Sequence, residues 1–93
     1  MKFEWDEEKN RKNVERHGIG FEEALGVFFD EHRIERFDFE HSWDEDRWQV
    51  LGMVGDILFV VYTERGENIR LISARKATEK EEKIYVDGLL SDK

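Results

Sequence analysis

Arginine is concentrated in one segment of this acidic chain, and arginine is well suited to holding phosphate. The 93 residues have a formal net charge of −8, yet residues 57–77 contain Arg65, Arg70, Arg75 and Lys76 against only two glutamates. A buried guanidinium group needs a partner, so these side chains are solvated, paired with carboxylates or directed at an anionic ligand. Ordinary salt bridges at solvated strand ends explain the same residues equally well.

A second polar cluster, "EHSWDEDRW", lies at the entrance to a predicted strand over residues 47–54. Glu45 and Arg47 share a face if both lie in a strand, which places a candidate general base beside a candidate phosphate clamp. A polar turn explains the same letters. Ser42 follows His41, but the pair is no hydrolase signal, because neighbouring side chains in a strand point apart and the motif G-x-S-x-G is missing.

His17 is a further candidate for acid–base chemistry, at the end of a predicted first helix. Trp5, Lys9, Asn13 and His17 recur every four residues and so form one stripe on that helix. An imidazole titrates near neutral pH and can donate or accept a proton. The same histidine can equally serve to neutralise the negative end of the helix dipole.

The composition predicts no metal site and no cofactor. The chain has no cysteine, which excludes a disulfide framework and Cys-ligated zinc or iron–sulfur sites. Its three histidines, His17, His32 and His41, show no ligand spacing. The longest apolar run, "ILFVVY", is too short to span a membrane, and the first ten residues show no apolar signal region. We therefore expect a cytoplasmic protein with no membrane segment.

The order of predicted elements indicates a single α+β domain over residues 1–93. Two helices come first, four β-rich runs follow, and one helix closes the chain, an α-α-β-β-β-β-α order. Because consecutive strands joined by short turns pair in hairpins, we expect an antiparallel sheet covered by helices on one face. The predicted helices cover residues 7–17 and 21–29 and a segment after Thr78, and the strands cover residues 33–39, 47–54, 57–64 and 68–76.

Apolar spacing predicts which side chains form the core. The second helix shows the periodic stripe of an α-helix that faces a core, made by Phe21, Ala24, Leu25, Phe28 and Phe29. Trp43 lies in a polar turn, so we do not expect it in the core.

The strand over residues 68–76 is harder to interpret, because strict alternation leaves neither face apolar. Alternation groups Ile69, Leu71, Ser73 and Arg75 on one face, and Arg70, Ile72, Ala74 and Lys76 on the other.

Several motifs occur in order along nearly the whole chain, from Phe3 to Tyr85. They are W-D-x-x-K-x-x-x-N-x-x-[KR]-H-G, F-E-E-A, H-S-x-x-E-x-R and Y-T-E-R-G…R-x-I-S-A-R-x-A-T. Together they resemble the BrnT family of ribonuclease toxins from type II toxin–antitoxin systems. The matching positions are Lys9, Asn13, His17, His41, Glu45, Arg47, Glu64, Arg65, Arg70, Ser73 and Arg75.

The resemblance implies a RelE-like fold and metal-independent cleavage of RNA. It also implies neutralisation by a BrnA-like antitoxin with a ribbon-helix-helix DNA-binding region, so DNA would be bound only through the antitoxin complex. We expect Arg75, supported by Arg47 and Arg65, to hold the scissile phosphate, with Glu45 as base and His17 as acid. The residues expected to bind RNA elsewhere are Lys9, Arg70 and Lys76.

A net charge of −8 disfavours binding to free nucleic acid. Charges are screened over about 8 Å at physiological salt, however, so a local group of arginines can attract phosphate on an acidic protein. The alternative function is a non-enzymatic, acidic binding module that seats a basic protein partner. Growth arrest on expression without a partner favours the nuclease, and harmless expression favours the binding module.

Overall fold

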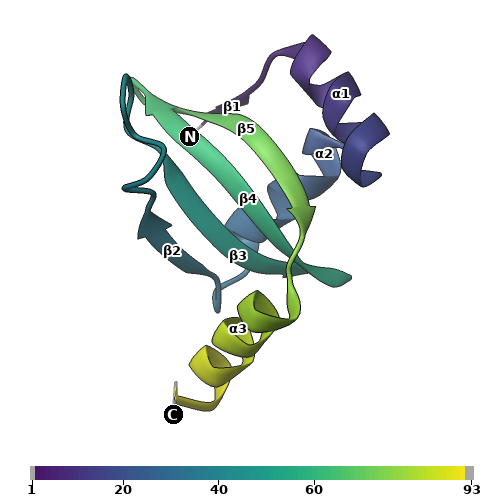
Figure 1. Cartoon of the computed structure of the whole chain (residues 1–93), viewed down its shortest axis with the longest axis vertical. Coiled ribbons are helices and arrows are strands. Elements are labelled where there is room, and N and C mark those ends of the chain that lie inside the picture. Colours follow the sequence, from purple (N-terminus) through teal and green to yellow (C-terminus); the bar gives the residue numbers. More distant parts are fainter. Residues whose placement is uncertain (1, 92–93) are drawn as a thin grey trace.

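Five strands form one mixed sheet in the computed structural model, which describes residues 2–91 (Figure 1). The strands are β1 (Lys2–Glu4), β2 (Ile34–Phe37), β3 (Trp48–Val54), β4 (Asp56–Arg65) and β5 (Asn68–Lys76). The helices are α1 (Glu7–His17), α2 (Phe21–Ala24), the 3₁₀ helix η1 (Leu25–Phe29) and α3 (Glu79–Ser91). The predicted α+β class is confirmed. None of these helices is both long and apolar enough to cross a membrane.

The sheet order is β1-β5-β4-β3-β2, and β1 pairs with β5 in parallel while all other pairs are antiparallel. The prediction of a wholly antiparallel, four-stranded sheet is therefore wrong. The first residues form an extra edge strand because Phe3 packs on the core: its ring lies 5.1 Å from that of Phe28.

The predicted ends of α1 are confirmed. The Asp6 side chain accepts hydrogen bonds from the backbone amides of Glu8 (2.8 Å) and Lys9 (3.3 Å), and Gly18 adopts the left-handed conformation (φ 72°) after the last turn. Asn13 is buried and fixes the helix to the edge of β5. Its amide donates to the Ala74 carbonyl (2.8 Å), and its oxygen accepts from the Ala74 amide (3.1 Å).

The second helical segment changes from α to 3₁₀ geometry, which changes the buried stripe. Phe21, Ala24 and Val27 are all fully buried, at the three-residue spacing of a 3₁₀ turn. Phe29 is 77% exposed, so its predicted place in the core is wrong. Phe28 remains half-buried against the core.

A β-bulge in β5 explains why alternation failed there. Val61 pairs with Ser73 and Tyr62 pairs with Leu71, so Ile72 is an extra residue on β5. The bulge lets Leu71 and Ala74 both face the core. We call this the core face, and it is covered by α2 and η1.

The bulge also gathers Arg70, Ser73 and Arg75 on the opposite face of the sheet, which we call the cleft face. They share it with Phe59 and Val61 of β4, which pair with Arg75 and Ser73.

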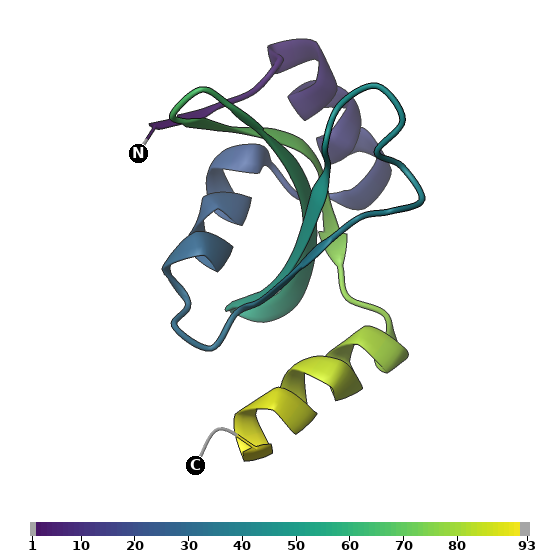
Figure 2. The same cartoon turned by 90° about the vertical axis from the view of Figure 1, so that its left-hand side faces the viewer.

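The closing helix α3 lies against one end of the cleft face, so the prediction that all helices cover one face is wrong (Figure 2). Tyr85 is buried against Leu51, Ile57 and Phe59. Its hydroxyl donates to the Asp30 carboxylate. Burial, with a further contribution from this hydrogen bond, raises the pKa of Tyr85 to about 12.

The closing helix begins directly after Thr78, as predicted, and a capping box holds its first turn. The Glu81 amide donates to Thr78 Oγ1 (3.2 Å), and the Thr78 amide donates to Glu81 Oε1 (2.9 Å).

Candidate active site

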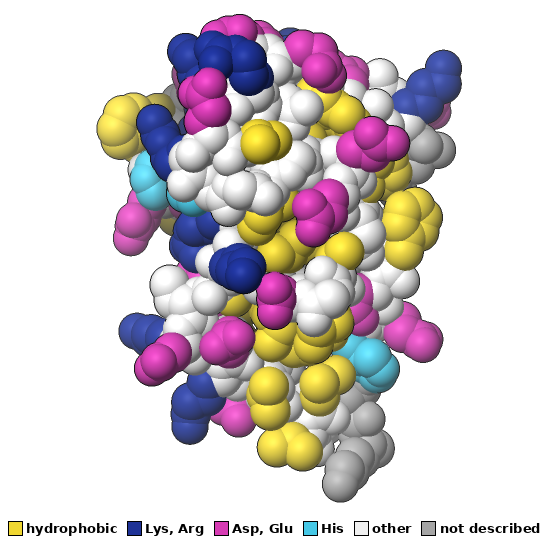
Figure 3. Space-filling view, turned by 90° about the vertical axis from the view of Figure 1, so that its right-hand side faces the viewer, with side chains coloured by type: hydrophobic (Ala, Val, Ile, Leu, Met, Phe, Trp, Pro, Cys, Tyr) yellow, Lys and Arg dark blue, Asp and Glu magenta, His cyan; other side chains and the backbone are white. Residues whose placement is uncertain are grey.

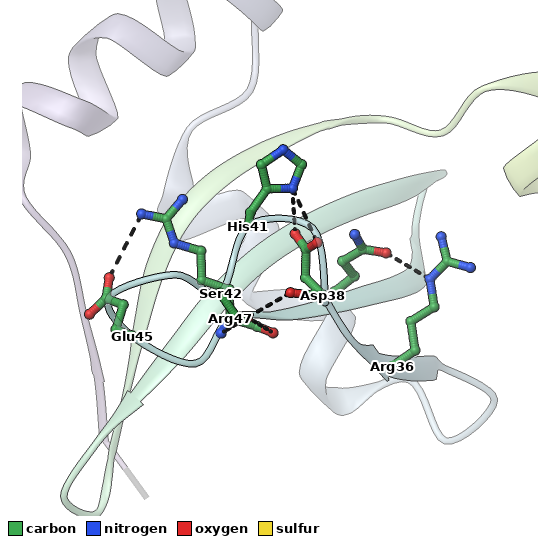
Figure 4. Close-up of polar contacts among 7 residues, drawn as sticks. Arg36, Asp38, His41, Ser42, Glu45 and Arg47 are labelled. Carbon is green, nitrogen blue, oxygen red and sulfur yellow. Dashed lines mark hydrogen bonds and ion pairs between the residues drawn. The ribbon is translucent and has the colours of Figure 1, made fainter.

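The loop between β2 and β3 stands over the cleft face and is closed by Ser42 (Figure 4). The Ser42 hydroxyl donates to the Asp38 carbonyl (2.6 Å) and accepts from the Arg47 amide (2.9 Å). Thr63 on β4 donates to the Asp46 carbonyl (2.5 Å) and ties the loop to the sheet. Ser42 therefore fixes the loop, in agreement with its sequence context, which gave no sign of a nucleophile.

His41 is oriented by the carboxylate of Asp38. Its Nδ1 lies 3.1 Å from both carboxylate oxygens, and Asp38 is only 4% exposed while the His41 side chain is 59% exposed. Burial alone would raise the pKa of Asp38, but hydrogen bonds from His41 and Gln49 outweigh it, so the pKa lies below its usual value. An ionised Asp38 accepts the Nδ1 proton, which leaves Nε2 of neutral His41 able to accept another proton.

Below this pair lies a depression on the cleft face, which we call the central cleft. Its lining residues come from β2 to β5, the loop and α3: Arg36, Asp38, His41, Arg47, Gln49, Phe59, Val61, Ile72, Ser73, Arg75 and Glu81. A histidine with a free nitrogen thus lines the same depression as three arginines.

Arg47 and Arg75 differ in how fully their donors are used. The buried Nε of Arg47 has no hydrogen-bond partner, and the nearest carboxylate oxygen, on Glu45, is 3.9 Å from its Nη2. Arg75 stacks on the Phe59 ring, 4.1 Å from the centroid, and donates to both oxygens of Glu81 (2.7 and 3.0 Å). The carboxylate contact of Arg47 is therefore much weaker than that of Arg75.

A second depression, the α1 groove, continues from the central cleft. It is lined by Lys9, Lys12, Asn13, Arg16, His17, Ile72 and Ser73. Ile72 and Ser73, at the β-bulge, line both depressions. The predicted acid His17 and the predicted RNA ligand Lys9 therefore lie in the α1 groove, while Arg47 lies in the central cleft. Figure 3 shows the side of the molecule that carries α1 and α3, with basic side chains gathered along its left-hand edge.

Comparison with models of protein families decides the assignment. The model for BrnT, the ribonuclease toxin of type II toxin–antitoxin systems, matches residues 5–81. The chain belongs to the BrnT family. The resemblance found in the sequence motifs is thus confirmed. A comparison with curated proteins returns no match.

Other predicted site residues of this BrnT-family chain lie outside the central cleft. Glu45 has one oxygen 3.6 Å from Arg65 and the other 3.9 Å from Arg47. Arg70 donates to Glu4 of β1 (2.7 Å). Lys76 lies 3.4 Å from Asp56 and its side chain is 70% exposed. These pairs match the salt-bridge alternative for the arginine-rich segment.

Sequence reasoning missed Asp38, Arg36 and Gln49. Arg36 Nε donates to Gln49 Oε1 (2.7 Å), and the Gln49 side chain is hydrogen-bonded to Asp38, so a chain of polar contacts leads to His41. The sequence shows Asp38 only as a polar residue near the end of the run "RIERFDF", which is weak evidence that it belongs to a site. Its pairing with His41 depends on how the loop closes, and the spacing of residues alone does not show that.

The motif Y-T-E-R-G…R-x-I-S-A-R-x-A-T contributes polar side chains to three different places in this BrnT-family chain. Arg65 meets the loop, Arg70 meets β1, and Ser73 and Arg75 line the central cleft. Within residues 2–91, no three His, Cys, Asp or Glu side chains are grouped so that they could hold a metal ion. What the cleft does offer is an oriented imidazole and several guanidinium groups.

Proposed function

We propose that this chain is an endoribonuclease toxin that cleaves RNA in the central cleft without a metal ion, and thereby inhibits translation and growth. The observation that supports it most is the Asp38–His41 pair beside Arg47, whose buried Nε has no partner. An oriented base in the same cleft as a guanidinium group with only one long carboxylate contact suits proton abstraction close to a phosphate.

The arginines bind and polarise the scissile phosphate. Arg47 lines the cleft, and the one carboxylate near its terminal nitrogens, on Glu45, is 3.9 Å away. Guanidinium donors to phosphate oxygens make strong, charge-assisted hydrogen bonds. Arg75 is held in place by Glu81 and Phe59, so its remaining donors are already oriented. Both groups stabilise the extra negative charge that develops on a phosphorane-like transition state.

Proton transfer completes the reaction. His41 Nε2 takes the proton of the ribose 2′-OH, and the 2′-oxygen attacks phosphorus. The bond from phosphorus to the 5′-oxygen breaks, and that oxygen takes a proton from the imidazolium form of His17 in the α1 groove. The products are a 2′,3′-cyclic phosphate and a 5′-hydroxyl.

Glu45 was expected to act as the base, but its surroundings favour another role. Both of its oxygens are directed at arginines, and it does not line the central cleft. We assign it to positioning Arg47 and assign the base to His41. Glu45→Gln and His41→Ala separate the two assignments, since loss of the base should cost more rate than loss of a positioning contact.

Variants of the cleft test the proposal. His41→Ala and Arg47→Ala should each lower the cleavage rate in excess chelator by about 10²–10³-fold, the usual cost of one such group. His32→Ala is the matched control, because His32 does not line the cleft. Arg75→Ala should also abolish toxicity, but it leaves Glu81 without its main partner, so its stability must be measured alongside. Full cleavage and toxicity in both His41→Ala and Arg47→Ala would refute the site.

The protein partner follows from family membership. A toxin of a type II system is neutralised by a protein antitoxin, and we propose a BrnA-like antitoxin that also supplies all DNA binding. The acidic surface, with a net charge of −8, suits a cationic segment of that partner. Calorimetry of the toxin with the product of the neighbouring gene should show nanomolar binding and loss of cleavage; absence of binding would remove this partner.

A further inference from the structure

A third depression, which we call the α3 hollow, adjoins the central cleft between the sheet and α3. Its surface is almost wholly apolar and includes Ile34, Leu51, Phe59 and Ile84, while Arg36, Gln49 and Glu81 lie where it meets the central cleft, which they also line. The cavity volume is about 80 Å³. Figure 3 shows hydrophobic side chains exposed toward the lower end of the molecule, where α3 lies. Arg36, Gln49, Phe59 and Glu81 also line the central cleft, so one ligand can occupy both depressions.

Arg36 brings unused donors to the border between this hollow and the central cleft. Its Nε donates to Gln49 Oε1 (2.7 Å), which fixes the plane of the guanidinium group. Within residues 2–91, neither terminal nitrogen of Arg36 has a hydrogen bond or an ion pair to a carboxylate. A fixed guanidinium group with free terminal N–H groups binds two adjacent acceptors as a fork.

Glu81 brings an unused acceptor position. Its Oε1 accepts from Arg75 Nη1 (2.7 Å) and from the Thr78 amide (2.9 Å), while Oε2 accepts only from Arg75 Nη2 (3.0 Å). A carboxylate oxygen has two lone pairs, so Oε2 can accept one further hydrogen bond. The hydrogen bonds from Arg75 hold the pKa of Glu81 below its usual value, which keeps it an acceptor at neutral pH.

Building on the proposed function, we infer that the α3 hollow binds the guanine base of the nucleotide whose phosphate lies in the central cleft. Guanine presents two adjacent acceptors, O6 and N7, and separate N–H donors on its other edge. This pattern matches the donor fork of Arg36 and the free acceptor of Glu81, which lie where the hollow meets the central cleft. Adenine places a donor, its N6 amino group, beside N7 and so opposes the fork. The apolar side chains contact the faces of the ring.

Binding of mononucleotides tests the inference without any need for cleavage. Calorimetry should show that the wild-type protein binds guanosine 3′-monophosphate about tenfold or more tightly than the adenosine, cytidine and uridine 3′-monophosphates, a usual ratio for a guanidinium fork on guanine. Arg36→Gln should reduce that ratio to about twofold or less, while the loss of its positive charge should weaken all four nucleotides by the same factor.

A pair of variants on α3 tests the place of binding. Ile84→Trp fills the hollow and should weaken guanosine 3′-monophosphate binding. Val86→Trp is the matched control, because Val86 is exposed on the same helix and does not line the hollow.

The outcomes separate this inference from the proposed function. Equal affinity for all four nucleotides, or a guanine preference that survives Arg36→Gln and Ile84→Trp, overturns the guanine subsite. RNA cleavage with no preference for guanine at the scissile nucleotide overturns the subsite and leaves the nuclease standing. Selective binding of guanosine 3′-monophosphate by a protein that cleaves no RNA supports the subsite and overturns the nuclease.

Discussion

Replacing Asp38 by Asn should slow RNA cleavage while preserving the fold, because the two side chains have the same shape. Asp38 is 4% exposed and holds His41 Nδ1 at 3.1 Å, so water cannot take its place. The carboxylate fixes the Nδ1–H tautomer and stabilises the imidazolium formed when Nε2 takes the 2′-OH proton. A hydrogen bond to a charged group contributes about 1.5–3 kcal/mol. At about 1.4 kcal/mol per tenfold in rate, the expected loss is about 10–100-fold.

A double-mutant cycle tests whether the loss acts through His41. Single-turnover cleavage would be measured for the wild type, Asp38→Asn, His41→Ala and the double variant, with urea unfolding of each to confirm that it is folded. We expect Asp38→Asn to cause no further loss in the His41→Ala background. A wild-type rate in Asp38→Asn, or an equal loss in both backgrounds, would refute the role of Asp38.

Three further predictions concern stability. A methyl group at Gly52 would lie 2.7 Å from Cβ and 2.9 Å from Cα of Val27, so Gly52→Ala should cost about 1–3 kcal/mol by urea unfolding; an unchanged midpoint would show that η1 packs differently. The pKa of Glu81 is lowered from 4.5, mainly by its hydrogen bond from Arg75, so its stabilisation is present above about pH 4.5 and is lost as the pH falls through the folded value. Glu81→Gln should therefore cost about 1–2 kcal/mol at pH 7 and flatten the acid side of the stability curve; an equal pH dependence in both proteins would contradict the shift. Phe28→Ala should cost about 3 kcal/mol, and Trp43→Ala less than about 0.5 kcal/mol because that side chain is 88% exposed; equal midpoint shifts would contradict the packing of η1.

Local hydrogen bonds explain which parts of the fold the sequence could predict. The Asp6 cap, the Gly18 end of α1 and the Thr78–Glu81 capping box each depend on residues close together in the chain. Each of these signals lies within a few consecutive residues, so the positions at which the helices start can be predicted from the sequence alone.

The missed features depend on contacts between distant segments. Strand β1 exists because it pairs with β5, more than sixty residues away, as the contact from Glu4 to Arg70 shows. The bulge at Ile72 places Leu71 and Ala74 on the core face together, and no local sequence pattern distinguishes it from a strand with simple alternation. The RelE-like assignment of this fold stays a prediction.

The candidate site shows the same division. Grouping of arginines was visible in the letters, and Arg47 and Arg75, which come from opposite edges of the β3–β5 region, do line one cleft. The sequence does not show which of these arginines can bind an anion, because that depends on which carboxylates fold against them. Glu81 pairs with Arg75, while the Nε of Arg47 has no partner. Assigning roles to charged residues therefore required the tertiary pairing.

The central claim is that the ribose 2′-OH is the nucleophile, and one measurement tests it directly. An RNA oligonucleotide would be incubated with the protein in excess chelator, beside the same oligonucleotide with a single 2′-deoxyribose at the cleaved position. We predict that the RNA gives a 2′,3′-cyclic phosphate and a 5′-hydroxyl, and that the deoxy-substituted linkage stays intact. Cleavage of the deoxy-substituted linkage, products with a 5′-phosphate, or activity that requires added magnesium would contradict the mechanism.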